Sequence, residues 1–230
     1  MNSSTKRFLV HLFAGLFAIV PFSTPVFAAV VTVSTSGEAP VSNILTSVLP
    51  PTTATAYSWS KANLSQFGQT FRAPGDGSME KLTLKTGTLG AKNAPFTLNI
   101  YRVENITDAP SAGTSIYTGT GTLPASQPPN PGYMTFTLDT PVALAAGKLY
   151  LFTLSYVGDP QTVSLGFFRG TGADSGSNVF WTSTDNGVTF ASSPSIGYLY
   201  IQGSAIPEAN TAMLLLPAIA GAALLIRHRR

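Results

Sequence analysis

Apolar and polar residues alternate one by one in three separate segments of this chain. In residues 96–101, for example, Phe96, Leu98 and Ile100 alternate with polar or amphipathic neighbours. The same period of two occurs in residues 79–85 and 134–139. A period of two places alternate side chains on opposite faces of a β-strand, whereas an amphipathic helix repeats its apolar positions about every 3.6 residues. The pattern therefore predicts strands that each bury one face.

Further strands are predicted at residues 30–33, 163–168 and 198–201, and residues 149–156 are apolar on both faces, as in the central strand of a sheet. Turn residues separate the strands at 73–77, 123–132, 159–160 and 170–177. Short strands at this spacing predict an all-β fold, an antiparallel β-sandwich of the jelly-roll kind, over residues 29–205. Residues 39–54 fit either a strand or one helical turn, and that segment stays open.

The N-terminal segment has the pattern of a secretory signal. Lys6 and Arg7 precede the apolar run 8–20, and small residues follow at Ala28 and Ala29. We expect a signal helix in residues 1–28 and cleavage between Ala28 and Ala29. A retained anchor or a buried helix is the alternative, but the run is short for a membrane span.

The C-terminal segment predicts a hydrophobic helix. Residues 211–226 carry no charge, and Arg227, Arg229 and Arg230 end the chain. Such a helix is about 24 Å long, slightly short of the roughly 30 Å hydrocarbon core of a bilayer. The basic residues should stay cytoplasmic, which places the upstream domain outside. A permanent membrane anchor is the alternative interpretation.

Ile206, Pro207 and Glu208, followed by the apolar run and the basic tail, resemble the PEP-CTERM sorting signal of Gram-negative bacteria. Ala209 stands where that family usually has proline. The resemblance covers residues 206–230 and implies export by the general secretion machinery, transient insertion in the inner membrane and cleavage by an exosortase. It further implies release to the cell surface or extracellular matrix, often in bacteria that make exopolysaccharide.

Two segments of the predicted domain, 69–77 and 141–150, resemble the jelly-roll sandwich of secreted choice-of-anchor proteins. This resemblance implies a fold and no activity. Residues 183–190 are similar to an Asp-box hairpin, in which Asn186–Gly187 favours a tight turn and Asp185 can accept hydrogen bonds from nearby amides. A β-propeller would need several such copies, so we interpret the single copy as a structural turn.

Charge and residue usage exclude several function classes. Of 13 Lys and Arg residues, five lie in the terminal segments, which leaves eight in residues 29–205 against nine of the 10 Asp and Glu residues. This near-neutral balance argues against nucleic-acid binding. Both histidines, His11 and His228, lie in the terminal segments and there is no cysteine. Serine- or cysteine-based catalysis with histidine, and zinc bound by His or Cys, are therefore excluded. A carboxylate pair could still hydrolyse a glycoside, but nothing in the sequence pairs two carboxylates at a defined separation, so we expect no enzyme and no catalytic residues.

Two kinds of binding stay open. A structural calcium ion could use oxygen-rich loops at 174–178 or at Asp76 and Glu80, although no metal site is predicted from them. A sugar site would use exposed aromatic residues, and the candidates are Trp59, Tyr101, Tyr133, Phe168 and Trp181, of which Trp59, Tyr101 and Trp181 are the preferred set. The alternative for each is core packing. The chain is thus expected to be a structural or interaction domain or, alternatively, a carbohydrate-binding module for exopolysaccharide. Exposed aromatics along one sheet face would favour the second.

Overall fold

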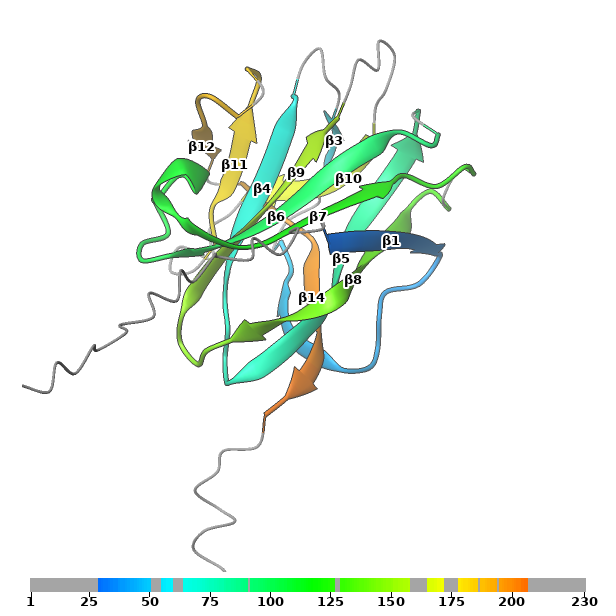
Figure 1. Ribbon diagram of the computed structural model, residues 1–230. Helices are drawn as coiled ribbons and strands as arrows, with labels where there is room; N and C mark the ends of the chain where they lie inside the picture. The colour runs from blue at the N-terminus through cyan, green and yellow to red at the C-terminus, as the bar shows by residue number, and fades with distance from the viewer. Residues whose placement is uncertain are drawn as a thin grey trace, which may run out of the picture.

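The computed structural model describes residues 29–50, 55–59, 64–90, 92–126, 129–157, 165–171, 178–185, 187–193 and 195–206 (Figure 1). The predicted signal helix, the hydrophobic C-terminal helix and most of the sorting motif lie outside these residues, as do Ala28, Pro207, Glu208, Arg227, Arg229 and Arg230. Ala29 and Ile206 are the first and last described residues.

The described chain is almost wholly β-structure. Its elements are β1 (Ala29–Ser36), β2 (Ile44–Val48), β3 (Thr55–Trp59), β4 (Gln66–Arg72), β5 (Gly77–Leu89), β6 (Pro95–Val103), η1 (Pro110–Ala112), β7 (Thr114–Thr122), β8 (Gly132–Leu144), β9 (Leu149–Tyr156), β10 (Leu165–Thr171), β11 (Phe180–Ser183), β12 (Ala191–Ser193), β13 (Ser195–Gly197) and β14 (Leu199–Ala205). The predicted all-β class is confirmed. In the described ranges, no helix reaches the length and apolarity that a bilayer crossing needs.

The strands form one curled sheet that folds into two layers. Layer A has the order β12-β11-β4-β9-β6-β7, and layer B contains β8, β5, β10, β13, β14, β2 and β3. β1 joins them, since it pairs with β7 through Ala29 and Val30 and with β8 from Val31 to Ser36. The β1–β7 pair is parallel, so the sheet is mixed and the prediction of a purely antiparallel sandwich is wrong at this point.

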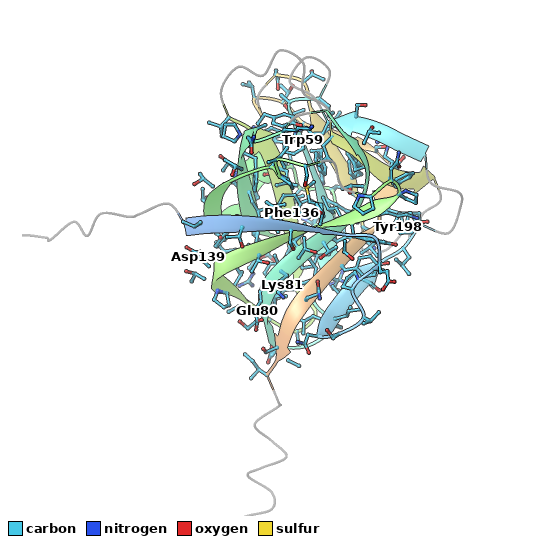
Figure 2. The ribbon with its side chains drawn as sticks, turned by 90° about the vertical axis from the view of Figure 1, so that its right-hand side faces the viewer. Trp59, Glu80, Lys81, Phe136, Asp139 and Tyr198 are labelled. Carbon is cyan, nitrogen blue, oxygen red and sulfur yellow. The ribbon has the colours of Figure 1, made fainter. Side chains whose placement is uncertain are left out.

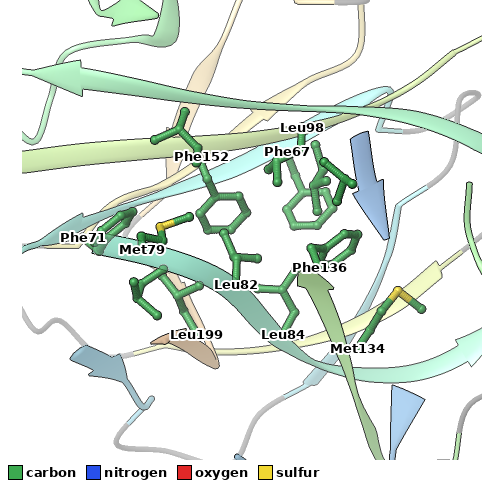
Figure 3. Packing of buried hydrophobic residues seen from close by; sticks show 14 of the residues in the cluster. Phe67, Phe71, Met79, Leu82, Leu84, Leu98, Met134, Phe136, Phe152 and Leu199 are labelled. Atoms are coloured by element: carbon green, nitrogen blue, oxygen red, sulfur yellow. The ribbon is translucent and has the colours of Figure 1, made fainter. Parts of the chain in front are cut away.

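The core lies between the layers and follows the alternation in the sequence. Phe96, Leu98 and Ile100 of β6 are buried toward Phe136 of β8, with the Phe96 and Phe136 rings edge to face and their centroids 5.3 Å apart. Figure 3 labels Leu98 and Phe136 in this core. Leu82 of β5 is also fully buried. Each residue of this kind contributes about 1.5–3 kcal/mol by leaving water, which makes the two-layer packing the main source of stability.

The Gln69 side chain joins the two layers at a place away from β1, where β4 lies beside β13. Gln69 of β4 is 1% exposed. Its Oε1 accepts the backbone N–H of Gly197 at 2.6 Å, and its Nε2 donates to the Gly197 carbonyl at 3.4 Å. The Gln69 amide therefore forms the two hydrogen bonds with Gly197 that the backbone of a neighbouring strand would otherwise form, and it connects layer A to layer B.

Candidate functional site

Trp59 is part of the core and not of the surface. Its side chain is fully buried, and its indole Nε1 donates to the carbonyl of Ser65 at 3.2 Å. The ring is stacked on Tyr156 and packs edge to face on Phe67. The expectation that Trp59 is exposed to a sugar is therefore wrong, because the inward face of β3 carries this residue into the space between the layers.

Tyr101 and Trp181 lie together on the outer face of layer A. Trp181 forms a small hydrophobic cluster with Val103, Leu149 and Leu151, and Tyr101 packs against that cluster. Trp181 is only 5% exposed, so it too is no surface platform. Tyr101 does lie on the predicted outer face of its strand, but it is half-buried, and this burial raises the pKa of its phenol.

Aromatic residues also gather on the outer face of layer B, where Tyr133, Phe168 and Tyr198 are partly exposed and Tyr200 is buried, with 9% of its surface exposed. Tyr133 of β8, Phe168 of β10, Tyr198 before β14 and Tyr200 on β14 surround Lys85 of β5, and we call these five residues the aromatic face. Figure 2 looks toward layer B and marks Tyr198 near the right-hand edge. The strands position these residues by alternation, since Met134, Leu199 and Ile201 on either side of the tyrosines point into the core.

Lys85 is the centre of the aromatic face. Its Nζ lies 4.6 Å from the centroid of the Tyr198 ring and 5.3 Å from that of Phe168. Lys85 is also the direct cross-strand partner of Tyr133. Backbone hydrogen bonds from Lys85 to Tyr198 and from Tyr198 to Phe168 hold the three residues side by side. Cation–π contacts of this kind orient the ammonium group over the rings.

Tyr133 and Tyr200 form the other half of the aromatic face. Their rings pack edge to face with centroids 6.0 Å apart. Burial, with the neighbouring phenols of Tyr133 and Tyr198, raises the pKa of Tyr200 to about 12. The Tyr200 phenol therefore stays neutral at physiological pH, and a neutral phenol can both donate and accept a hydrogen bond.

Uncharged polar residues border the aromatic face. Thr83 Oγ1 lies 2.8 Å from Thr135 Oγ1 and donates to Gln202 Oε1 at 3.1 Å. Ser36 and Ser47 are the exposed strand neighbours of Tyr133 and Tyr200. Thr83 and Gln202 are buried, so the exposed hydroxyl groups beside the aromatic rings are those of Ser36 and Ser47.

The Asp-box-like segment forms the predicted structural turn. The Asp185 carboxylate accepts the backbone N–H of Thr189 at 2.9 Å and the hydroxyl of Ser183 at 2.8 Å. The hydrogen bonds from Thr189 and Ser183 lower the pKa of Asp185 to about 2. Gly187 has a φ of +84°, a value that favours glycine. The prediction that Asp185 binds nearby backbone amides is confirmed.

The carboxylates of Asp76 and Glu80, named above for a possible calcium ion, accept hydrogen bonds from the protein itself. Asp76 accepts the N–H of Ala146 at 2.7 Å, and Glu80 accepts the hydroxyl of Ser204 at 2.7 Å. Within the described part of the chain, no three His, Cys, Asp or Glu residues come together as a metal site would require. The calcium hypothesis for residues 174–178 falls largely outside the described residues, since only Asn178 is described.

Two members of the aromatic face, Tyr133 and Phe168, were among the sequence candidates, whereas Tyr198 and Tyr200 were missed. The signal was present, because the two tyrosines alternate with Leu199 and Ile201 in a segment predicted as a strand. Alternation alone shows that they share a face and cannot show which other strands lie beside it.

No protein-family model matches the chain, and no curated protein matches it. Two solved structures of Cwp84 are similar to part of it. One comprises the cysteine protease and lectin-like domains of this surface layer associated protein of Clostridium difficile, with 12% identity and a TM-score of 0.41, covering 62% of this chain and 33% of that one. The other is clostridial Cwp84 after propeptide cleavage, with 11% identity, a TM-score of 0.43, and coverage of 66% and 38%. The chain thus spans little more than a third of the length of these structures.

Proposed function

We propose that residues 29–205 form an exported, non-catalytic domain that binds a polysaccharide at the aromatic face. The observation that supports this proposal is the gathering of Tyr133, Phe168, Tyr198 and Tyr200 around Lys85 on one outer surface. The partly exposed rings of Tyr133, Phe168 and Tyr198 offer apolar surfaces for sugar rings, and Lys85 and the tyrosine phenols offer hydrogen bonds.

The terminal segments supply the location in this proposal. The signal pattern of residues 1–28 would export the chain, and the resemblance of residues 206–230 to a PEP-CTERM signal would bring it to an exosortase at the inner membrane. The bound polymer would then be an exopolysaccharide at the cell surface or in the extracellular matrix. A polymer with carboxylate groups would also gain from the ammonium group of Lys85.

Binding is tested with the processed protein recovered from the exported fraction, by electrophoresis through gels that contain a neutral or a uronic-acid polysaccharide. We expect Tyr198→Ala and Lys85→Ala to weaken binding at least tenfold, which corresponds to about 1.4 kcal/mol. Lys81→Ala is the matched control, because Lys81 lies on the same strand and face but makes none of the cation–π contacts found within the described residues. If no polysaccharide slows the migration of the wild-type protein, the binding proposal is wrong and the purely structural role remains.

Sorting is tested separately by the intact mass of the protein from the surface or medium of its host. A species that begins at Ala29 and ends near Pro207 is expected. Replacing Pro207 and Glu208 by alanine should trap the unprocessed chain in the inner membrane. A mature species that keeps Arg230 would instead mean a permanent anchor.

A further inference from the structure

β1 begins at Ala29, the residue that follows the predicted signal cleavage site. Ala29 is partly buried and packs against the main core. It pairs with Gly119 on β7, so its backbone has a defined place where layers A and B meet. Cleavage between Ala28 and Ala29 would convert the nitrogen of Ala29 from an amide into a free α-ammonium group.

Asp139 of β8 holds the start of this strand. Its Oδ2 accepts the backbone N–H of Val30 at 2.7 Å, and its Oδ1 accepts the phenol of Tyr117 at 3.4 Å. Adjacent backbone nitrogens in an extended chain are about 3.5 Å apart, so the nitrogen of Ala29 lies within roughly 6 Å of the carboxylate. A small rotation of this terminal residue, or one bridging water, spans the remaining gap.

The Asp139 carboxylate is available to a cation. Within the described residues, Arg102 and Glu104 form an ion pair, and no ion pair there includes Asp139. The hydrogen bond from Val30 holds the pKa of Asp139 below its usual range, so the group is ionised at neutral pH. The titratable residues on the strands around it are Tyr117 on β7, Tyr133 on β8, and Glu80, Lys81 and Lys85 on β5, whereas β1 has none.

We propose that Asp139 binds the α-ammonium group that signal cleavage creates at Ala29. Processing would then add to the domain an ion pair that the precursor cannot form, because an uncleaved chain has only a neutral amide at this position. The inference rests on the export part of the proposed function and does not depend on the aromatic face, so polysaccharide binding can fail without affecting it.

The ion pair has a defined pH dependence. The carboxylate raises the pKa of the Ala29 amino group in the folded state above its unfolded value of about 7.7–8.0. The stabilisation is therefore complete below that unfolded value, and it is lost as the pH rises through the higher folded-state pKa.

The test uses the full-length chain with its own signal, exported by a Gram-negative host, and the mature protein identified by N-terminal sequencing. The rate at which acetic anhydride acetylates the α-amino group is measured from pH 6 to 10. We expect several-fold slower acetylation of the folded protein than of the urea-unfolded protein at pH 7.5. Asp139→Asn should remove the difference while keeping an acceptor for the Val30 N–H, and Glu104→Gln, which removes an exposed carboxylate elsewhere, should not.

A second variant is needed because Asp139→Asn could change the pKa of the amino group simply by disturbing the fold. One glycine placed between Ala28 and Ala29 moves the new amino group one residue away and leaves Asp139 intact, and it should abolish the raised pKa. A mature N-terminus other than Ala29 would overturn the inference. So would an ordinary α-amino pKa in the wild-type protein, or a raised pKa that persists in both variants.

Discussion

Trp59 and Tyr156 stack with their ring centroids 3.9 Å apart and their planes at 15°. The Tyr156 hydroxyl donates to the Trp59 carbonyl at 3.2 Å, so the two residues are joined by a ring contact and a hydrogen bond. Trp59 belongs to β3 in layer B and Tyr156 to β9 in layer A. The pair therefore connects the layers across the core.

Replacing Trp59 by alanine should lower the free energy of unfolding by about 3–5 kcal/mol, since it removes a fully buried ring and leaves a cavity. Tyr156→Phe keeps the ring and loses the hydroxyl, and it should cost only about 1 kcal/mol. Urea denaturation measures both. Val188→Ala, at a side chain that is 79% exposed, is the control and should change stability by less than about 0.5 kcal/mol. Similar losses in all three variants would show that the stacked pair has no special weight.

Replacing Gln69 by leucine should cost about 1–3 kcal/mol, because the N–H and C=O of Gly197 would lose their buried partner. The loss should be accompanied by faster hydrogen exchange at the Gly197 amide, because this exchange measures local separation of β13 from β4 directly. Gln66→Leu, a change at the partly buried start of the same strand, is the comparison. Unchanged exchange at Gly197 would contradict the assigned role of the Gln69 amide.

Replacing Leu151 by alanine should destabilise the domain by about 2–5 kcal/mol. Leu151 is fully buried in the small cluster outside layer A, and Leu154→Ala is the matched change on the same strand but in the main core. Comparable losses in thermal or urea unfolding are expected. If Leu151→Ala costs far less than Leu154→Ala, the outer cluster contributes little to the fold.

Asp185 should stabilise the hairpin only while it is ionised. Its folded-state pKa of about 2 lies below the ordinary aspartate pKa of 3.8, so its contribution is present above pH 4 and is lost as the pH falls toward 2. We expect Asp185→Asn to make the stability of the domain less dependent on pH in this interval. Urea midpoints at pH 2, 3, 4 and 6 measure the effect, with Glu104→Gln as the control, and parallel curves for wild type and Asp185→Asn would contradict it.

Much of the strand structure followed from the sequence because alternation reports burial directly. Residues 79–85, 96–101 and 134–139 lie in β5, β6 and β8, and 149–156 is β9, which pairs with β4 and β6 on its two sides. β7 was missed. Its threonines and glycines give no apolar alternation, and of its bulky residues only Tyr117 is buried.

The site was harder to predict than the strands. Aromatic residues occur both in buried cores and in exposed binding sites. The sequence around Trp59 and Trp181 therefore could not predict that both side chains are buried. The aromatic face combines residues from β5, β8, β10 and the start of β14, which are far apart in sequence. These strands become neighbours because β5 pairs with β8, β10 and β14, and a local pattern carries no information on such pairing.

β1 also has a consequence for the order in which the domain can fold. It is the first part of the mature domain to leave the membrane in the proposed export route, yet Val30 and its partner Asp139 lie 109 residues apart. Because loops must close before such distant pairs can form, β1 cannot complete its pairing until both β7 and β8 have been translocated. The two layers should therefore be joined through β1 only after the first 144 residues, up to the end of β8, are outside.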